Sequence, residues 1–331
     1  MAGACPPSLS IAVANAGGMG ACGALLLPSD AIRTWVEEFR QHSTGAFQLN
    51  LWIPSPPAAR DPAAEQQHRN FLSAWGPPVP PDAGDSVVPG FEAQCEALLA
   101  ARPRVISSVM GLYAPAFVAE MKSGGILWFA TATTVDEARA AAAAGADAII
   151  AQGAEAGGHR SSFNLDDAER NAVGLVALVP QIADAVAVPV IAAGDIADAR
   201  QIAAALHLGA SAVMIGTAFL RSPEALIHPA WAGRLAATEA HHTTLTRAFT
   251  GRAGRSIVTR YVEASAARDA PPPAPYPIQR GFTRPMRENA ARVNDPERLQ
   301  MWAGESARLA CTDSAATITR ELWAETVHLL S

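Results

Sequence analysis

The feature that most constrains this chain is a regular alternation, up to Leu220, of short apolar runs with alanine-rich amphipathic stretches. Such runs predict buried strands, and stretches with a 3.6-residue period predict helices. We predict strands at residues 20–25, 47–52, 104–109, 126–130, 148–152, 188–193 and 212–215. Helices are predicted at residues 8–16, 29–41, from the early 60s to the mid-70s, and at 90–101, 114–123, 135–144, 173–185 and 197–206. Strands that alternate with helices form a parallel sheet, so the pattern predicts an α/β fold of the TIM (β/α)8-barrel class.

A closed barrel of this class needs eight strands, and one fewer is predicted for this chain. The first predicted element is a helix that follows the loop Met1-Ala2-Gly3. We expect the first strand to lie upstream of Met1, so that Met1 is downstream of the true start of the protein. The alternative is a barrel with a gap, whose two exposed sheet edges would favour aggregation.

The alternation stops after Leu220, where a helical region punctuated by prolines begins. We therefore predict a barrel domain over residues 1–221 and a mainly helical lid or substrate-binding region over residues 222–331. The proline-rich segment 271–277 fits a stiff linker that carries one segment across a site, and a ligand for a proline-binding module is the alternative. Residues 54–89 are predicted to form a long loop with one helix.

The composition excludes several classes of protein. A net charge of −6, spread along the chain, leaves no basic stripe for a nucleic-acid partner. The apolar opening has no charge before Asp30 and is interrupted by prolines and glycines, which argues against export or a membrane span. The cysteines show neither a CxxC pair nor regular spacing, so we expect no metal site, no disulfide framework and a cytoplasmic setting.

Lysine and histidine placement narrows the chemistry further. Lys122, the only lysine, lies where a helix ends, whereas a Schiff-base aldolase or a pyridoxal-phosphate enzyme needs its lysine at the carboxyl ends of the strands. The adjacent His241 and His242 would point about 100° apart on a helix and rarely chelate one ion. Both enzyme classes that depend on a catalytic lysine are therefore excluded, and metal-dependent hydrolysis is disfavoured.

The loop from Gln152 to His159 is the first candidate for chemistry. Gly157 and Gly158 precede His159 directly after a strand, so the histidine emerges at the catalytic face beside glycines that let the backbone approach a planar ligand. We predict a functional role for His159, and a surface-loop histidine is the alternative. Glu155 either orients it or is simply solvated.

The loops after the last two predicted strands are candidates for a phosphate site. Gly194, Gly216 and Thr217 follow these strands, where backbone N–H groups and a helix N-terminus bind phosphate in barrels of this class. Ordinary tight turns are the alternative. Asn50 and Gln152 end strands with amides that can read the edge of a flavin ring or satisfy a neighbouring loop.

These motifs together resemble the nitronate monooxygenases, formerly called 2-nitropropane dioxygenases. The resemblance covers nearly the whole chain through residues 1–3, 12–20, 152–159, 189–194, 214–220, 223–225, 249–252, 275–277 and 302–304. It implies FMN as cofactor and His159 as the active-site histidine. Most of the flavin contacts that we predict are implied by this resemblance, and we add a few neighbouring residues. The full set is Met1, Ala2, Gly3, Asn50, Gln152, Gly157, Gly158, Gly194, Asp195, Met214, Gly216 and Thr217.

The resemblance also implies a reaction. An alkyl nitronate, such as propionate 3-nitronate, would give an electron to FMN, O2 would reoxidise the flavin, and a carbonyl compound and nitrite would result. His159 would position the nitronate, or act as base if a neutral nitroalkane is accepted, and Tyr276 would close over the substrate. A homodimer is the hypothesis for the assembly.

Two departures from the family pattern leave alternatives open. Asp195 stands where a second glycine is usual, and Glu305 stands where glutamine is typical. A carboxylate beside the expected phosphate would weaken FMN binding unless it points away. The alternatives are an NAD(P)H-dependent flavin reductase of the quinone or enoyl reductase type, and a non-catalytic flavin-binding relative.

Overall fold

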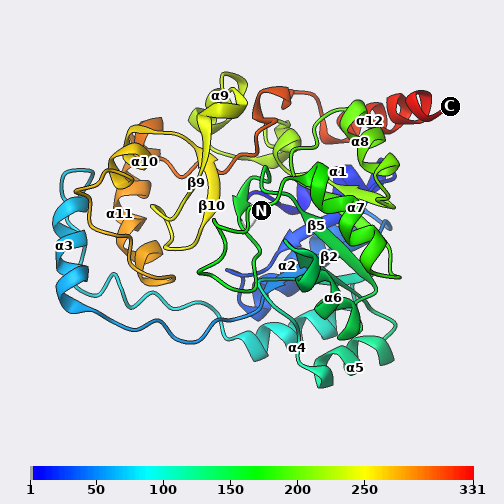
Figure 1. The fold of residues 1–331 in the computed structure, drawn as a ribbon, viewed down its shortest axis with the longest axis horizontal. Coiled ribbons are helices and arrows are strands. Elements are labelled where there is room, and N and C mark those ends of the chain that lie inside the picture. Colours follow the sequence, from blue (N-terminus) through cyan, green and yellow to red (C-terminus); the bar gives the residue numbers. More distant parts are fainter. Residues whose placement is uncertain (1–2) are drawn as a thin grey trace.

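The computed structural model describes residues 3–331. Its main sheet has seven parallel strands in the order in which they follow along the chain (Figure 1). These strands are β1 (Gly20–Gly23), β2 (Phe47–Trp52), β3 (Val105–Val109), β4 (Leu127–Ala132), β5 (Ala148–Gln152), β7 (Val190–Ala193) and β8 (Ala212–Met214). Each pairs in parallel with the next, as in Gly20 with Phe47 and Ala193 with Met214. All the predicted strands are therefore confirmed.

Helices precede or connect the strands as predicted, and all of them except the helix at residues 62–72 pack on the sheet. They are α1 (Pro7–Asn15), α2 (Ser29–His42), α3 (Pro62–Leu72), α4 (Phe91–Ala101), α5 (Pro115–Ser123), α6 (Val135–Ala143), α7 (Leu175–Ala185) and α8 (Ala199–His207). The largest apolar core lies between these helices and the sheet, and the side chains of Phe39, Leu49, Ile106 and Trp128 are fully buried in it. Burial of this continuous apolar surface stabilises the βα assembly.

The sheet does not close in the part of the chain that the structure describes. No hydrogen-bonded ladder joins β1 to β8 across residues 3–331, so these two strands are the edges of the sheet. The carboxyl ends of all seven strands still meet at one face, because parallel strands share their direction. That face is where the sequence places its candidate residues.

The region after residue 221 is mainly helical, as predicted, but it also contains a pair of strands that was not predicted. It contains the helices α9 (Pro229–Ala236), α10 (Arg260–Ser265), α11 (Ile278–Arg292) and α12 (Ala315–Leu330), but also an antiparallel pair, β9 (Thr243–Thr246) and β10 (Gly254–Ile257). The sequences of β9 (TTLT) and β10 (GRSI) are short and mostly polar, so neither an apolar run nor a clear alternation of polarity reveals them. All residues of β10 are nevertheless buried, which depends on the rest of the fold.

The long segment after β2 packs with this later region. Leu72 at the end of α3 belongs to the same apolar cluster as Phe249, Tyr261 and Phe282, and α3 lies beside α11 (Figure 1). At the other end, α12 packs against α8 and α1 on the barrel side. The division at residues 221 and 222 stays a prediction.

None of the helices within residues 3–331 combines the length and the apolarity that crossing a bilayer requires.

Candidate functional site

A cavity of about 1900 Å³ opens at the carboxyl ends of the strands and continues into the interior of the sheet. Its lining includes residues from strand ends and from the later region, which closes one side of it. Of the predicted site residues, the following line the cavity: Gly3, Asn50, Gln152, Gly157, Gly158, His159, Gly194, Asp195, Met214, Gly216, Thr217 and Tyr276. Met1 and Ala2 lie outside the described residues. The structure therefore brings the described candidates to one cavity.

Gln152 holds the loop that carries His159. Its amide nitrogen donates to the carbonyl oxygen of His159 at 3.1 Å, and its amide oxygen accepts from the backbone N–H of Ser161 at 2.8 Å. Arg160, which is buried, donates to the carbonyl oxygen of Gln152 at 2.7 Å. The end of β5 and the His159 loop are thus fixed to each other. These contacts match the alternative from the sequence, in which the Gln152 amide satisfies a neighbouring loop.

Glu155 neither orients His159 nor lies free in solvent. Both of its carboxylate oxygens accept from the backbone N–H of Leu175 at 3.0 Å, at the first residue of α7. A carboxylate at this place satisfies a free N–H and the positive end of the helix dipole. Both interpretations of Glu155 from the sequence are wrong, because its partner lies twenty residues further along the chain.

Gly157 is required by close packing against a distant segment. A Cβ atom at this position would lie 2.5 Å from the nitrogen of Gly304 and 2.6 Å from the carbonyl carbon of Ala303. Gly158 has a φ of +84°, which L-residues rarely adopt. The two glycines therefore let the loop turn against residues 303–304 and present His159 to the cavity.

His159 sits in a cage of aromatic rings. The ring of Trp52 lies 4.8 Å away edge-on, and that of Trp302 lies 4.7 Å away, both measured between centroids. Nε2 of His159 lies 2.8 Å from the hydroxyl of Thr250. These contacts hold the imidazole in one orientation and bring together strand β2, the loop after β5 and two segments of the later region.

A buried arginine lies beside this cage. Arg252 is 3% exposed, and its guanidinium carbon lies 5.4 Å from the ring centroids of both Trp52 and Tyr276. It donates to the hydroxyl of Ser55 and to the sulfur of Met110, while its Nε has no hydrogen-bond partner among the described residues. The buried hydroxyl of Tyr276 also lacks one. Buried donors without partners are rare, and here they lie together.

The electrostatics of this end of the cavity are cationic. Burial, with the charges of Arg252 and Arg280, lowers the pKa of His159 to about 3. Burial also lowers the pKa of Arg252 to about 10, which still leaves it charged at neutral pH. No carboxylate forms an ion pair with Arg252 or Arg280 in the part of the chain that the structure describes. The site therefore presents a neutral imidazole next to an uncompensated positive charge, which favours an anion.

The other end of the cavity is built from the loops after β7 and β8. Gly194 has a φ of +125° and Asp195 a φ of +55°, so the chain turns sharply there. The N–H groups of Gly194, Asp195 and Gly216 donate no backbone hydrogen bond among residues 3–331, which leaves them available to a ligand. The hydroxyl oxygen of Thr217 accepts a hydrogen bond from the backbone N–H of Gly304 at 3.0 Å. Free N–H groups at tight turns bind anions.

Asn50 keeps a free acceptor in the cavity. Its amide nitrogen donates to the hydroxyl of Ser107 on β3 at 3.0 Å, which orients the side chain. The amide oxygen accepts no hydrogen bond from the described residues. The amide oxygen of Asn50 is therefore free to accept a hydrogen bond from a ligand.

The sequence prediction missed the surroundings of His159. Trp52, Thr250, Arg252 and Trp302 were assigned no role, and the signal for Trp52 was its place at the end of a strand. The other three lie on segments far from β5 in the sequence, so only the tertiary fold shows the contact.

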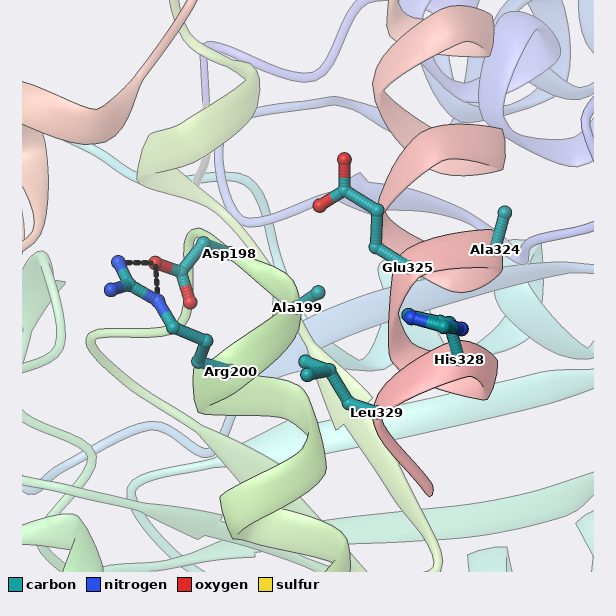
Figure 2. Close-up of a pocket in the computed structure, with 7 residues that line it drawn as sticks. All are labelled: Asp198, Ala199, Arg200, Ala324, Glu325, His328 and Leu329. Carbon is teal, nitrogen blue, oxygen red and sulfur yellow. Dashed lines mark hydrogen bonds and ion pairs between the residues drawn. The ribbon is translucent and has the colours of Figure 1, made fainter. Parts of the chain in front are cut away.

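A second pocket, of about 630 Å³, lies between α8 and α12. Its charged side chains do not converge on a ligand: Arg200 forms an ion pair with Asp198, while Glu325 and His328 project from α12 without meeting them (Figure 2). Within residues 3–331 no group of three or more His, Cys, Asp or Glu side chains could hold a metal ion. The cavity around His159 is therefore the candidate site.

Comparison with known proteins identifies the family. A family model described as nitronate monooxygenase matches residues 1–325. This chain belongs to the nitronate monooxygenase family. A probable nitronate monooxygenase of Staphylococcus aureus strain Newman is 34% identical over 325 residues, which span 96% of this chain and 90% of that protein. The resemblance seen in the sequence is confirmed, and the chain is a flavin oxidoreductase of the nitronate monooxygenase type.

Solved structures agree with this assignment. A nitroalkane oxidase from Streptomyces ansochromogenes is 33% identical with a TM-score of 0.89, covering 99% of this chain and 95% of that one. FabK from Thermotoga maritima is 26% identical with a TM-score of 0.75, covering 100% of this chain and 91% of that one. The curled sheet of seven parallel strands is consistent with the TIM-barrel-like structures of these nitronate monooxygenase relatives.

Proposed function

We propose that this nitronate monooxygenase family member uses FMN and O2 to oxidise alkyl nitronates, such as propionate 3-nitronate, to a carbonyl compound and nitrite. The observation that carries the proposal is the neutral, caged His159 beside the buried, uncompensated Arg252. An alkyl nitronate is a small anion on a short carbon chain, and propionate 3-nitronate carries a carboxylate as well, so binding it away from water needs a positive charge. Arg252 supplies that charge, and the rings of Trp52 and Tyr276 lie beside it.

The residues of the cavity fit FMN. The free N–H groups of Gly194, Asp195 and Gly216 would receive its phosphate, because they form a concave set of donors after two strands. Asn50 has an amide oxygen free for the ring edge. The proposed cofactor contacts are Met1, Ala2, Gly3, Asn50, Gln152, Gly157, Gly158, Gly194, Asp195, Met214, Gly216 and Thr217. FMN, when bound, supplies the redox chemistry between the nitronate and O2.

Arg252 and Tyr276 would bind the nitronate oxygens. The Nε of Arg252 and the hydroxyl of Tyr276 are buried donors that still lack acceptors, and 5.4 Å separates the guanidinium carbon from the tyrosine ring centroid. Charge-assisted hydrogen bonds from both would place the substrate beside His159. Tyr276, on the segment before α11, would close the site and exclude water.

His159 would act as a base when the substrate is the neutral nitroalkane. Its pKa of about 3 leaves the imidazole unprotonated at neutral pH, so it can accept a proton, although only as a weak base. The hydroxyl of Thr250 lies within hydrogen-bond distance of Nε2 of His159 and sets the orientation of the ring. With a preformed nitronate no proton has to be removed, so His159 then serves to position the anion.

The test is flavin spectroscopy on the purified full chain. We expect a yellow protein, or one that FMN reconstitutes, whose flavin spectrum changes when propionate 3-nitronate is added without oxygen. Admitting O2 should restore the spectrum and release nitrite. A protein that does not bind FMN, or whose flavin ignores the nitronate, contradicts the proposal.

A second candidate, left open by the sequence, is an NAD(P)H-dependent flavin reductase of the quinone or enoyl reductase type. Rapid bleaching of the bound flavin by NADH or NADPH, together with no response to nitronate, would select it.

Three further proposals concern the fold, the domains and the assembly. We infer a TIM (β/α)8-type barrel over residues 1–221, a lid and substrate region over residues 222–331, and a homodimer. The succession of parallel strands and helices supports the barrel. The mass in solution tests the dimer, because one chain has a mass of 34.4 kDa.

A further inference from the structure

Asp195 occupies an unusual place in the proposed phosphate site. Its φ of +55° lies in the left-handed region, directly after Gly194 with a φ of +125°. Aspartate tolerates this conformation better than most residues with a side chain. The backbone can therefore keep the turn that exposes its N–H groups even though position 195 is not glycine.

Asp195 lies at the cavity, and one of its carboxylate oxygens is shielded from solvent. The residue lines the cavity, and its Oδ1 is buried without a hydrogen-bond partner among residues 3–331. Burial raises the pKa of this carboxyl, hydrogen bonding to Ser306 opposes the rise, and the charges of Glu305 and Glu155 add to it. A buried carboxylate oxygen with no donor is unfavourable, and a protonated carboxyl is much less so once its O–H finds an acceptor.

The charges around Asp195 do not compensate it. Glu305 forms an ion pair with Arg255 at 3.1 Å, so that guanidinium is already engaged. Glu155 accepts from the first residue of α7, at the backbone N–H of Leu175. Asp198, at the start of α8, pairs with Arg200. Every charged group that faces Asp195 directly is a carboxylate, and in the described chain no cation pairs with it.

We propose that Asp195 binds the FMN phosphate in its protonated form, through an O–H···O hydrogen bond, so that flavin binding takes up one proton and weakens as the pH rises. This inference rests on the proposed function. The proton comes from solvent, and no covalent bond changes. A carboxylate and a phosphate in contact repel each other, and sharing one proton removes that repulsion.

The expected effect follows from linkage. Where Asp195 is ionised in the free protein but protonated in the complex, the apparent Kd for FMN rises about tenfold per pH unit. Free FMN adds a pH dependence of its own, because a phosphate monoester has its second pKa near about 6. The comparison with Asp195→Asn separates the two, because asparagine is neutral, has nearly the same shape and also tolerates left-handed φ.

The experiment is titration of the apoprotein with FMN between pH 5 and 9, followed by quenching of flavin fluorescence. We expect Asp195→Asn to bind FMN at least tenfold more tightly than the original chain at pH 8, and the two to converge at pH 5. Asp195→Gly, which suits the same backbone, should follow Asp195→Asn. Riboflavin, which lacks the phosphate, should bind with no such difference. Asp184→Asn, an exposed change of equal charge on α7, is the control and should match the original chain.

Calorimetry gives a second readout. Binding of FMN at pH 8 in buffers of different ionisation enthalpy should show uptake of one more proton by the original chain than by Asp195→Asn. Parallel pH profiles for the two proteins, with equal proton uptake, would overturn the inference while leaving FMN binding intact. Absence of FMN binding by every variant at every pH would instead overturn the proposed function, and this inference with it.

Discussion

The two ends of the cavity differ in charge and in origin. At one end, His159 lies beside Arg252 and Arg280. Neither arginine forms an ion pair with a carboxylate in the described chain. At the other end, Asp195 faces Glu305 and Glu155. The cationic end is assembled from side chains on distant segments, whereas the backbone of the acidic end is built from turns that directly follow β7 and β8, with Glu155 and Glu305 reaching Asp195 from other segments. Two anionic groups, the nitronate and the phosphate, would thus meet opposite surroundings.

This difference bears on how each end selects a ligand. Backbone N–H groups attract any phosphate, and the carboxylates near Asp195 then set the affinity and its pH dependence. At the His159 end, selection rests on one buried guanidinium between aromatic rings. Such a site favours a small anion, because desolvation strengthens the attraction between the charges.

The largest expected effect is at His159. Replacement by asparagine should lower kcat/KM for a neutral nitroalkane by about 10²-fold, the lower end of the usual contribution of a general base, because an imidazole of such low pKa is a weak base. The loss with preformed nitronate should be much smaller, since no proton is removed. Because the pKa of His159 is about 3, the original chain should show no His159 inflection between pH 5 and 8 in kcat/KM for nitronate. An inflection near neutrality that disappears in His159→Asn would contradict the neutral imidazole.

Arg252 tests whether the cationic end binds the anion. Arg252→Met keeps an apolar body between Trp52 and Tyr276 but removes the charge, and should raise KM for nitronate by about 10²-fold. The affinity for FMN should change little, because the phosphate lies at the other end. Arg284→Met is the matched control, since Arg284 is exposed and pairs with Glu288. Equal losses in both variants would refute the assignment.

The fold was largely predictable from the sequence because strands buried in a parallel sheet and the helices between them carry local signals. Gly20–Gly23 and Ala148–Gln152 were found as apolar runs. The antiparallel pair β9 and β10 was missed, since both strands are short and mostly polar and their burial depends on segments distant in sequence. The same cause hid the contact of α3 with α11.

The site was predictable where the backbone alone defines it. Gly158 and Gly194 carry positive φ, and glycine in a strand-end loop indicates this. The partners of side chains were not predictable: Glu155 bonds α7, and Arg252 reaches Trp52 from a distant part of the chain. Hydrogen bonds and ring contacts of this kind depend on tertiary packing, which no local pattern encodes.

The loop between the two ends can be tested through stability. Gly157→Ala would place a Cβ atom 2.5 Å from the nitrogen of Gly304, so backbone must shift. We expect the free energy of unfolding to fall by about 1–3 kcal/mol, as for other overpacked sites, with weaker binding at both ends. Gly233→Ala in α9 is the control, because a Cβ there meets nothing within 4 Å and alanine favours a helix. Urea denaturation measures both. Equal stability of the two variants would show that the 157–304 contact can relax.

The smallest expected effect is at Tyr276. Its hydroxyl has no partner among the described residues, so Tyr276→Phe should leave the free energy of unfolding unchanged or slightly raised. In the complex the hydroxyl would donate to a nitronate oxygen, and its loss should lower kcat/KM for nitronate by about tenfold. Because the ring stays against Trp52 and Arg252, the aromatic surface of the cationic end is kept. Kinetics and denaturation on the same preparation separate the two effects. A variant that is less stable but equally active would show that the hydroxyl serves the fold, and the nitronate would then depend on Arg252 alone.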